Sequence, residues 1–254
     1  MVRQSHQGPL VVQRPFFPEG REVCHVYILH PPGGLVPGDT LAIDIDVRER
    51  ARVLVTSPAA TKIYRSDGRT ARQIQTLRVG PGALLEWLPQ ETIVFEGAQA
   101  QVRTAVELTG DAAFLGWEIL CLGRPACGEA FRSGACRQHW ELWRDGRPLV
   151  LERANFKDDV QRAAWGLRGA AVTGTLLVSS PMLDGVAGGL LDDLRALPSD
   201  SRDLCSATLV GGAVVLRYLG GSAERARKLF EKAWCLLRPP LGNRPACFPR
   251  VWST

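Results

Sequence analysis

The chain has little of what membrane proteins and zinc-binding proteins need. Its 254 residues contain no uninterrupted apolar run near the roughly 18 residues that a membrane-spanning helix requires. The first residues, Met-Val-Arg-Gln-Ser-His-Gln, lack the apolar core of a secretion signal, so we expect a cytoplasmic protein with no membrane partner. The seven cysteines include no C-x-x-C pair, and we expect most of them to be buried as small hydrophobic residues.

Familiar catalytic motifs are also missing. There is no G-x-S-x-G nucleophile elbow, no P-loop and no dinucleotide fingerprint after an expected strand. The four histidines form neither an H-x-H nor an H-x-x-x-H pattern. His25 and His30 are five residues apart, so on one uninterrupted strand they point to opposite faces. They are weak candidates for metal ligands, and only if the strand ends before Pro31.

Charge of one sign is not strongly in excess. The chain has 31 basic and 26 acidic residues and a net charge of +5. The arginines are scattered and are not interleaved with aromatic residues, so nucleic acid is not an expected partner. This mild basic excess permits an acidic protein partner. The alternative reading as a nucleic-acid binder predicts steeply salt-dependent binding to DNA or RNA.

Short alternating segments dominate the first two thirds of the chain. Four segments alternate polar and apolar residues with the period of a strand that has one buried face: 41–47, 71–79, 101–108 and 136–143. Turn signals containing Gly, Pro and Asp recur about every 10 residues. We therefore predict a mainly β single domain over 1–254, β-rich over 8–180, built as a sandwich, a barrel or stacked sheets.

Two α-helices are expected in the C-terminal third. The first, 182–197, carries a stripe of leucines and one valine and is closed by Pro198. The second, 222–238, has Ser222 as its N-cap candidate, and Pro239-Pro240 should end it.

A β-hairpin is predicted between these helices. Residues 204–209 and 213–219 have strand character and flank Gly211-Gly212. The result is a helix–hairpin–helix unit over 182–238, followed by a C-terminal tail, 239–254.

Basic residues of the second helix and the tail are candidates for partner binding. Arg225, Lys228 and Lys232 lie off the apolar stripe of the helix, and Arg250 and Trp252 belong to the tail. The alternative is a plain amphipathic helix that only covers the β core.

Three acids lie among apolar residues of expected strands. Strand alternation gives Glu86, Glu118 and Glu152 the same faces as the apolar residues two positions away. An acid in such surroundings is unfavourable unless it is paired, protonated or bound to a cation. These acids are therefore candidates for an interior polar path. The alternative is a structural ion pair with one of four arginines: Arg65, Arg124, Arg153 or Arg168.

The same acids allow an enzyme alternative. Two carboxylates within reach of each other in an open cleft would suit a β-fold hydrolase or lyase. Nothing in the sequence favours such a pair over an ion pair.

Several ordered blocks resemble one family, the urease accessory protein UreD (also called UreH). The three densest are 25–34 (His-Val-Tyr-Ile-Leu-His-Pro-Pro-Gly-Gly), 86–93 (Glu-Trp-Leu-Pro-Gln-Glu-Thr-Ile) and 116–125 (Gly-Trp-Glu-Ile-Leu-Cys-Leu-Gly-Arg-Pro). Further matches begin at Gly8-Pro-Leu and end with the tail segment Pro249-Arg-Val-Trp252. The resemblance covers about residues 8 to 254.

This resemblance implies a non-enzymatic role in urease maturation. UreD proteins are scaffolds that bind the urease apoprotein and recruit UreF, which docks the GTPase UreG that brings nickel. The resemblance also implies a β-helical fold with two helices, and homodimerisation through the UreF-containing complex. It implies no tightly bound cofactor, with nickel(II) as a transient cargo.

An interior nickel route is part of what the resemblance implies. Asp39, Glu118 and Glu152 match acidic positions of such a route in the family. Strand alternation, described above, independently places Glu118 and Glu152 among apolar residues. Glu86 is a candidate from strand alternation only and is not among the positions that the resemblance implies.

Overall fold

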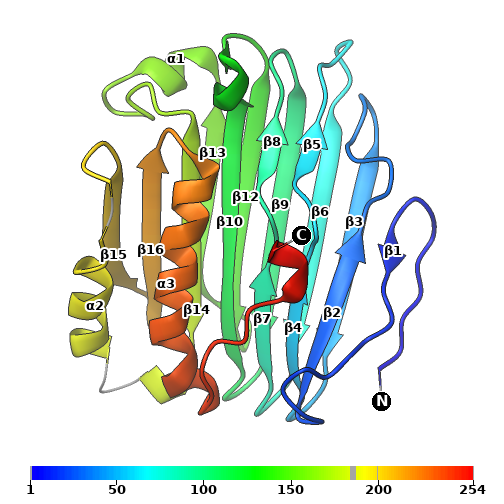
Figure 1. Ribbon diagram of the computed structural model, residues 1–254, viewed down its shortest axis with the longest axis vertical. Helices are drawn as coiled ribbons and strands as arrows, with labels where there is room; N and C mark the ends of the chain where they lie inside the picture. The colour runs from blue at the N-terminus through cyan, green and yellow to red at the C-terminus, as the bar shows by residue number, and fades with distance from the viewer. Residues whose placement is uncertain (1, 184–186, 199, 254) are drawn as a thin grey trace.

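Two stacked β-sheets make up most of the molecule (Figure 1). The computed structural model describes residues 2–183, 187–198 and 200–253. Sheet I contains, in spatial order, β1 (Val11–Val12), β2 (Val23–Leu29), β4 (Arg52–Thr56), β7 (Leu84–Leu88), β10 (Ala113–Arg124), β14 (Val172–Ser179), β16 (Ala213–Gly220) and β15 (Leu204–Val210). Three short strands attach to it: β5 (Thr61–Ile63), β8 (Thr92–Val94) and β11 (Glu129–Ala130). Sheet II contains, in spatial order, β13 (Arg147–Phe156), β12 (Ala135–Arg144), β9 (Gln99–Leu108), β6 (Ala71–Val79) and β3 (Thr40–Val47).

The chain winds between the two sheets in stacked coils. Strands β2, β4, β7 and β10 pair in parallel in sheet I, and β3, β6, β9 and β12 pair in parallel in sheet II. Parallel neighbours require a crossover, and here each crossover passes through the other sheet. This confirms the prediction of a mainly β single domain with stacked, β-solenoid-like coils.

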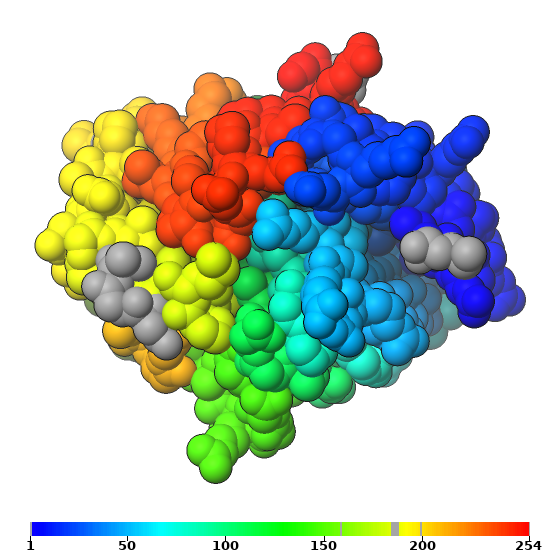
Figure 2. All heavy atoms as spheres, turned by 90° about the horizontal axis from the view of Figure 1, so that it is seen from below, coloured from blue at the N-terminus to red at the C-terminus, as the bar shows by residue number. Residues whose placement is uncertain are grey.

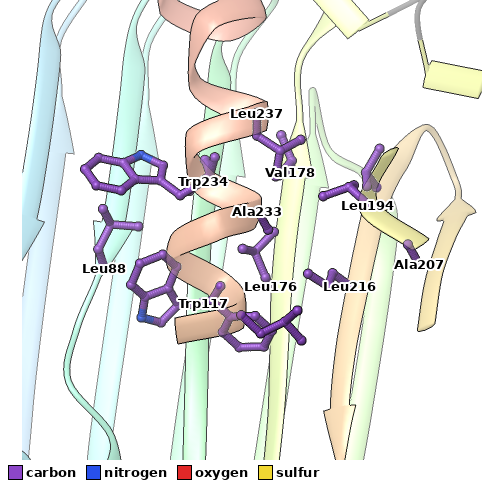
Figure 3. Packing of buried hydrophobic residues seen from close by; sticks show 14 of the residues in the cluster. Leu88, Trp117, Leu176, Val178, Leu194, Ala207, Leu216, Ala233, Trp234 and Leu237 are labelled. Atoms are coloured by element: carbon purple, nitrogen blue, oxygen red, sulfur yellow. The ribbon is translucent and has the colours of Figure 1, made fainter. Parts of the chain in front are cut away.

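Helices α2 (Ala187–Arg195) and α3 (Ala223–Gly242) lie on the outer face of sheet I, whereas the short α1 (Asp158–Arg162) contacts β13 of sheet II at one end of the strands. The 3₁₀ turns are η1 (Pro125–Cys127), η2 (Pro181–Leu183) and η3 (Arg250–Ser253). Helix α3 packs on β10 and β14, with Phe230 and Trp234 fully buried against Trp117 and the aliphatic residues shown in Figure 3. The rest of the core lies between the two sheets. No helix among the described residues is long and apolar enough to cross a membrane.

Both predicted C-terminal helices exist, with different bounds. Helix α2 begins at Ala187 and ends at Arg195, so it is shorter than the predicted 182–197. Residues 184–186 of that prediction lie outside the described residues. The short helix α1 was not predicted.

The predicted end of the second helix before Pro239 is wrong. Helix α3 continues to Gly242, and Asn243, with a φ of 52°, forms its left-handed C-cap. Proline lacks an N–H donor and its ring crowds the carbonyl of residue i−4, yet the helix continues here and carbonyls of its last turn find partners. The Asn243 N–H donates to the Pro239 oxygen at 2.8 Å, and Arg52 Nη1 donates to the Gly242 oxygen at 2.9 Å. The expected N-cap Ser222 is confirmed, since its hydroxyl accepts from the Arg225 N–H.

The hairpin is confirmed, whereas the burial of most cysteines is not. Strands β15 and β16 pair antiparallel around Gly211-Gly212. Cysteines 24, 121 and 136 are buried, 127, 205 and 235 are exposed, and 247 is intermediate. The exposed ones lie in a turn, on the edge strand β15 and on helix α3.

Candidate functional site: two polar clusters on opposite faces of one sheet

Glu86 and Glu118 lie on neighbouring strands but point to opposite faces of sheet I. The parallel register of β7 and β10 pairs Glu86 with Leu115, so Glu86 shares the outer face with Leu115, whereas Glu118 lies three residues further on. Glu86 therefore lies under α3, and Glu118 points between the sheets. Both side chains are buried, as the apolar surroundings in the sequence predict.

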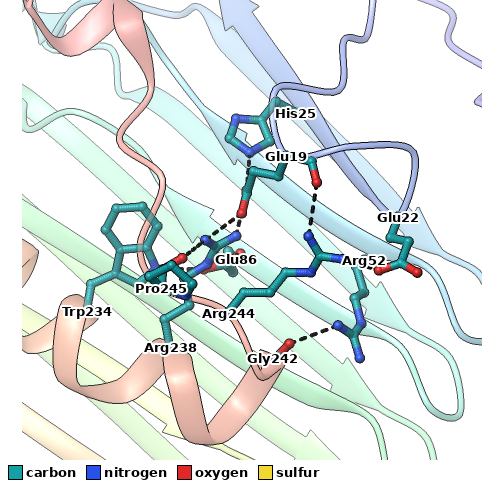
Figure 4. A network of polar contacts seen from close by, with 10 residues as sticks. All are labelled: Glu19, Glu22, His25, Arg52, Glu86, Trp234, Arg238, Gly242, Arg244 and Pro245. Atoms are coloured by element: carbon teal, nitrogen blue, oxygen red, sulfur yellow. Dashed lines mark hydrogen bonds and ion pairs between the residues drawn. The ribbon is translucent and has the colours of Figure 1, made fainter.

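The outer cluster is built around Arg238 of α3 (Figure 4). The Arg238 Nε donates to Glu86 Oε1 at 2.9 Å, and its Nη1 and Nη2 each donate to a Glu19 oxygen at 2.7 Å. Trp234 Nε1 also donates to Glu86 Oε1, at 2.6 Å. His25 Nε2 donates to Glu19 Oε1 at 2.7 Å. One guanidinium thus connects the segment before β2, strand β7 and helix α3.

Protonation in the outer cluster follows from burial. Two carboxylates face one guanidinium, so the cluster holds an excess negative charge, and burial raises the pKa of Glu86. Burial acts in the same direction on Glu19, but hydrogen bonds from Arg238 and His25 hold the pKa of Glu19 below its ordinary value. Burial also lowers the pKa of His25, although Glu19 opposes this. The imidazole is therefore neutral and serves Glu19 as a hydrogen-bond donor.

The outer cluster fixes both ends of the chain. Arg244, which follows α3, donates from Nη1 to the Glu19 carbonyl oxygen at 3.0 Å and pairs with Glu22. The C-terminal tail continues into an aromatic group in which the rings of Trp234, Phe248 and Trp252 contact one another. In Figure 2 the C-terminal atoms in red lie directly against the N-terminal atoms in blue. The outer cluster is thus closed and structural.

The inner cluster surrounds Glu118 between the sheets. Its Oε2 accepts from Gln138 Nε2 of β12 at 2.7 Å, and its Oε1 contacts the hydroxyl of Thr104 of β9. The same hydroxyl contacts Gln75 Oε1 of β6. The hydroxyl has one proton and cannot donate to two acceptors, so either the Glu118 carboxyl group or the Gln75 amide group donates to it. Burial raises the pKa of Glu118, which fits a neutral carboxylic acid in this row.

The row of polar side chains extends in both directions from Glu118. At one side, Gln73 and Gln75 line a cavity of about 240 Å³, together with His30 and Trp87. At the other side, Glu152 of β13 lies opposite Trp140 of β12. Glu152 pairs with Arg217 of β16 at the molecular edge. The interior between the sheets thus contains a polar layer within an otherwise apolar core.

Unsatisfied polar atoms mark both parts of this layer. Gln73 Oε1 and Trp87 Nε1 beside the cavity are buried and have no hydrogen-bond partner within the described residues. Trp140 Nε1, near Glu152, is likewise buried and has no hydrogen-bond partner within the described residues. Buried polar atoms of this kind are uncommon, and ordered water is the usual partner of such atoms in proteins.

The predicted site residues occupy different places. His25 and His30 do not meet: His25 belongs to the outer cluster and His30 lines the cavity. Burial lowers the pKa of His30, against the charge of Asp39. Asp39 itself is exposed, and its Oδ2 accepts from the Val36 N–H at 3.0 Å.

The alternative of a structural ion pair with an arginine is confirmed for Glu86 and Glu152, but the four arginines considered as partners are wrong. Glu86 pairs with Arg238 and Glu152 with Arg217, neither of which was among the four considered. Arg124, one of those four, pairs with Glu129. The actual partners come from helix α3 and strand β16, far away in sequence. Among the described residues there is no group of three or more His, Cys, Asp or Glu side chains that could hold a metal ion.

The residues predicted to bind a partner differ in their exposure and in the contacts that their side chains already make within the protein. Arg225 forms two hydrogen bonds to Asp203, at 2.7 and 3.0 Å, and Lys228 pairs with Glu224 at 2.6 Å. Lys232 and Arg250 are exposed. Trp252 is half-buried in the aromatic group, and its Nε1 donates to the Thr56 hydroxyl at 2.9 Å. Trp252 therefore has a role in the fold itself.

Sequence reasoning missed several polar residues of both clusters. Glu19 and Arg238 stand in a loop and at the end of a helix, where no strand alternation marks them. Thr104, Gln75 and Gln138 do alternate with apolar neighbours on strands, and that alternation could have identified them.

Comparison with known proteins agrees with this architecture. A family model described as UreD urease accessory protein matches residues 1–253. A urease accessory protein UreD of Dechloromonas aromatica is 45% identical over 252 residues, covering 98% of this chain and 87% of the relative. One from Marinobacter nauticus is 47% identical over 260 residues, covering 100% of this chain and 86% of the relative. One from Azoarcus is 43% identical over 256 residues, covering 100% and 88%.

These matches indicate a protein with an accessory role towards urease rather than a catalytic one. The chain belongs to the UreD family of urease accessory proteins. The resemblance in the ordered sequence blocks is thereby confirmed.

Replacing Arg238 tests the outer cluster. Arg238→Met leaves Glu19 and Glu86 buried without their cation, and loss of one partner of a buried pair costs about 3–5 kcal/mol. We expect the free energy of unfolding in urea to fall by that amount. Lys232→Met, an exposed change on the same helix, should stay within about 0.5 kcal/mol of the wild type. An Arg238→Met protein as stable as the control would contradict the structural role of the cluster.

Replacing Glu118 tests whether its carboxyl group is neutral. Burial raises the folded-state pKa above the unfolded value of about 4.5, so the wild type loses stability as the pH rises from 4.5 towards the folded-state pKa. Glu118→Gln does not ionise, so its stability relative to the wild type should increase over that range. Unfolding free energies of both proteins between pH 4 and pH 8 measure this. A difference that does not change with pH would show that Glu118 ionises normally.

Proposed function

We propose that this protein acts in urease maturation as a scaffold that binds the urease apoprotein and recruits UreF, and through UreF the GTPase UreG. In this proposal nickel(II) is a transient cargo that passes through the polar layer between the sheets, and the protein works in the cytoplasm. Membership of the UreD family supports the role in urease maturation. The observation that carries the nickel route is the row Gln75–Thr104–Glu118–Gln138 inside an apolar core.

The chemistry of this row suits a metal ion that must move on. Carboxyl, amide and hydroxyl oxygens are hard donors, and nickel(II) binds more tightly to nitrogen and sulfur ligands than to these oxygens. Binding of a cation at Glu118 would require the carboxyl to release its proton, which weakens the binding further. A site of this kind holds nickel briefly and releases it. The buried atoms without partners beside the cavity and at Trp140 extend the row of possible contacts.

The acids contribute unequally to the proposed route. Glu118 and Glu152 belong to the polar layer, and Asp39 acts on His30 at the side of the cavity. Glu86 points away from the layer and is held by Arg238 and Trp234, so in our proposal it supports the fold instead of the route.

The enzyme alternative has less support from the geometry. Glu86 and Glu118 are on opposite faces of sheet I and cannot act on one substrate. Glu152 is paired with Arg217. A carboxylate pair in an open cleft would therefore have to be found elsewhere.

Urease activation in cells tests the proposed function. Deletion of this protein should leave urease without nickel, and the tagged protein should co-purify with the urease apoprotein and UreF. Glu118→Gln should keep these complexes while reducing the nickel content of urease by about tenfold, as expected if one weak ligand worth ~1.4 kcal/mol is lost. Glu107→Gln, on the exposed side of β9, serves as the control. Full nickel loading with Glu118→Gln would remove the interior route, and full loading without the protein would remove the maturation role.

A further inference from the structure

The outer face of sheet II is an open β surface. Alternate side chains of β3, β6, β9, β12 and β13 point away from the core, while α2 and α3 pack on sheet I at the other side of the molecule. The register aligns the outward residues in rows across the strands. From the end near α1, the four rows are Thr40, Arg72, Gln101, Arg137 and Asn155; Ala42, Ile74, Arg103, His139 and Arg153; Asp44, Thr76, Ala105, Glu141 and Leu151; and Asp46, Arg78, Glu107 and Trp143.

Positive and negative charges are separated on this face. The two rows near α1 contain four arginines and no acid, whereas the other two rows contain four acids and one arginine. The acids are all paired within the protein: Asp44 and Glu107 with Arg78, Asp46 with Arg48, and Glu141 with Arg103. The negative charge of the face is therefore already compensated, whereas part of its positive charge is not.

Three exposed arginines of the two rows near α1 remain without a partner. Arg72, Arg137 and Arg153 form no side-chain hydrogen bond or ion pair within the described residues. Gln101 alone separates Arg72 from Arg137 in one row, and Arg153 is the diagonal neighbour of Arg137 on the next strand. Like charges at neighbouring positions of a sheet repel each other, so this arrangement is unfavourable in the isolated protein. Negative charge supplied by a partner would remove that repulsion.

We propose that Arg72, Arg137 and Arg153 form an arginine patch that binds an acidic surface of a folded protein partner. A guanidinium binds a carboxylate through two parallel N–H donors, and arginine is enriched in protein interfaces. The five strands are about 4.8 Å apart, so the patch holds its charges at fixed positions on a face about 20 Å wide. The inference goes beyond the proposed function and does not depend on the nickel route, because the patch faces away from the polar layer.

The rest of the face favours a protein over a nucleic acid or an anionic membrane. Those polyanions carry negative charge throughout, and a surface broad enough to cover the patch would also meet Asp44 and Glu107 in the neighbouring rows. A folded protein can place carboxylates over the patch alone, and neutral or basic groups over the acids. Leu151, which is 51% exposed and lies beside Arg153 on the same face of β13, adds an apolar contact at the edge of the patch.

Two triple variants with the same loss of charge test the patch. The patch variant is Arg72→Gln, Arg137→Gln and Arg153→Gln, and the control variant is Arg14→Gln, Arg21→Gln and Lys232→Gln, three exposed cations elsewhere on the surface. The probe is a fluorescein-labelled octaglutamate peptide at low salt. Its Kd should rise about tenfold in the patch variant and change less than about twofold in the control variant. The patch variant should unfold in urea like the wild type, because its arginines have no internal partner.

Cross-linking of the full chain in cells shows which kind of partner uses the patch. A photo-reactive p-benzoylphenylalanine in place of Gln101 stands between Arg72 and Arg137. Mass spectrometry of the product identifies the segment that it reaches. We expect a segment of another protein in which Asp and Glu outnumber Lys and Arg, and loss of this product in the patch variant but not in the control variant.

Several results would overturn the patch. One is an equal affinity of the two triple variants for octaglutamate. Another is a cross-linked product that is a second copy of this chain or a neutral or basic segment, or the absence of any protein product. A patch variant that loses binding to duplex DNA or to phosphatidylserine vesicles, but keeps its binding to octaglutamate, would indicate a polyanion of another class and would also overturn the proposal. These results leave the proposed role in urease maturation unaffected.

Discussion

The contact between Arg238 and the two carboxylates of Glu19 and Glu86 is the constraint on which the rest of the structure depends. Arg238, Glu86 and Glu19 are 3%, 2% and 8% exposed as side chains, so their charges are removed from water. Such burial is favourable only when every charge has a partner with good geometry. The guanidinium meets this condition with all three of its nitrogens. Helix α3 is thereby held in one position on sheet I, and the N-terminal segment is held against it.

This arrangement divides sheet I into two chemically different faces. The outer face is closed by α3, the aromatic group around Trp234 and the C-terminal tail. The inner face keeps the Glu118 carboxyl group, two glutamines and a threonine in contact between the sheets, and burial raises the pKa of Glu118. The ion pairs and apolar packing of the outer face stabilise the sheet independently of the polar atoms on the inner face. In our proposal, a preformed but weakly binding interior suits a metal ion that must move on.

Much of the fold, and part of the candidate site, could be predicted from local sequence patterns. Strand alternation predicted β6 with its observed bounds and located Glu118 and Glu152 on buried or partly buried faces. It could not predict the partner of Glu86, because Arg238 is 152 residues away and only the packing of α3 brings the two together. The continuation of α3 past Pro239 depends likewise on Arg52, a tertiary contact at the helix end. Local patterns show which side chains are buried, whereas the identity of their partners follows from the topology.

The position at which nickel(II) binds tests most directly the central claim, which is an interior nickel route beside Glu118. Crystals of the protein grown with nickel(II) and measured at the nickel absorption edge would show where the ion resides. Our account predicts an anomalous peak between the sheets beside Glu118, in contact with the row formed by Gln75, Thr104 and Gln138, and no such peak in Glu118→Gln. A peak confined to surface histidines, equal in the two proteins, would contradict an interior route for nickel.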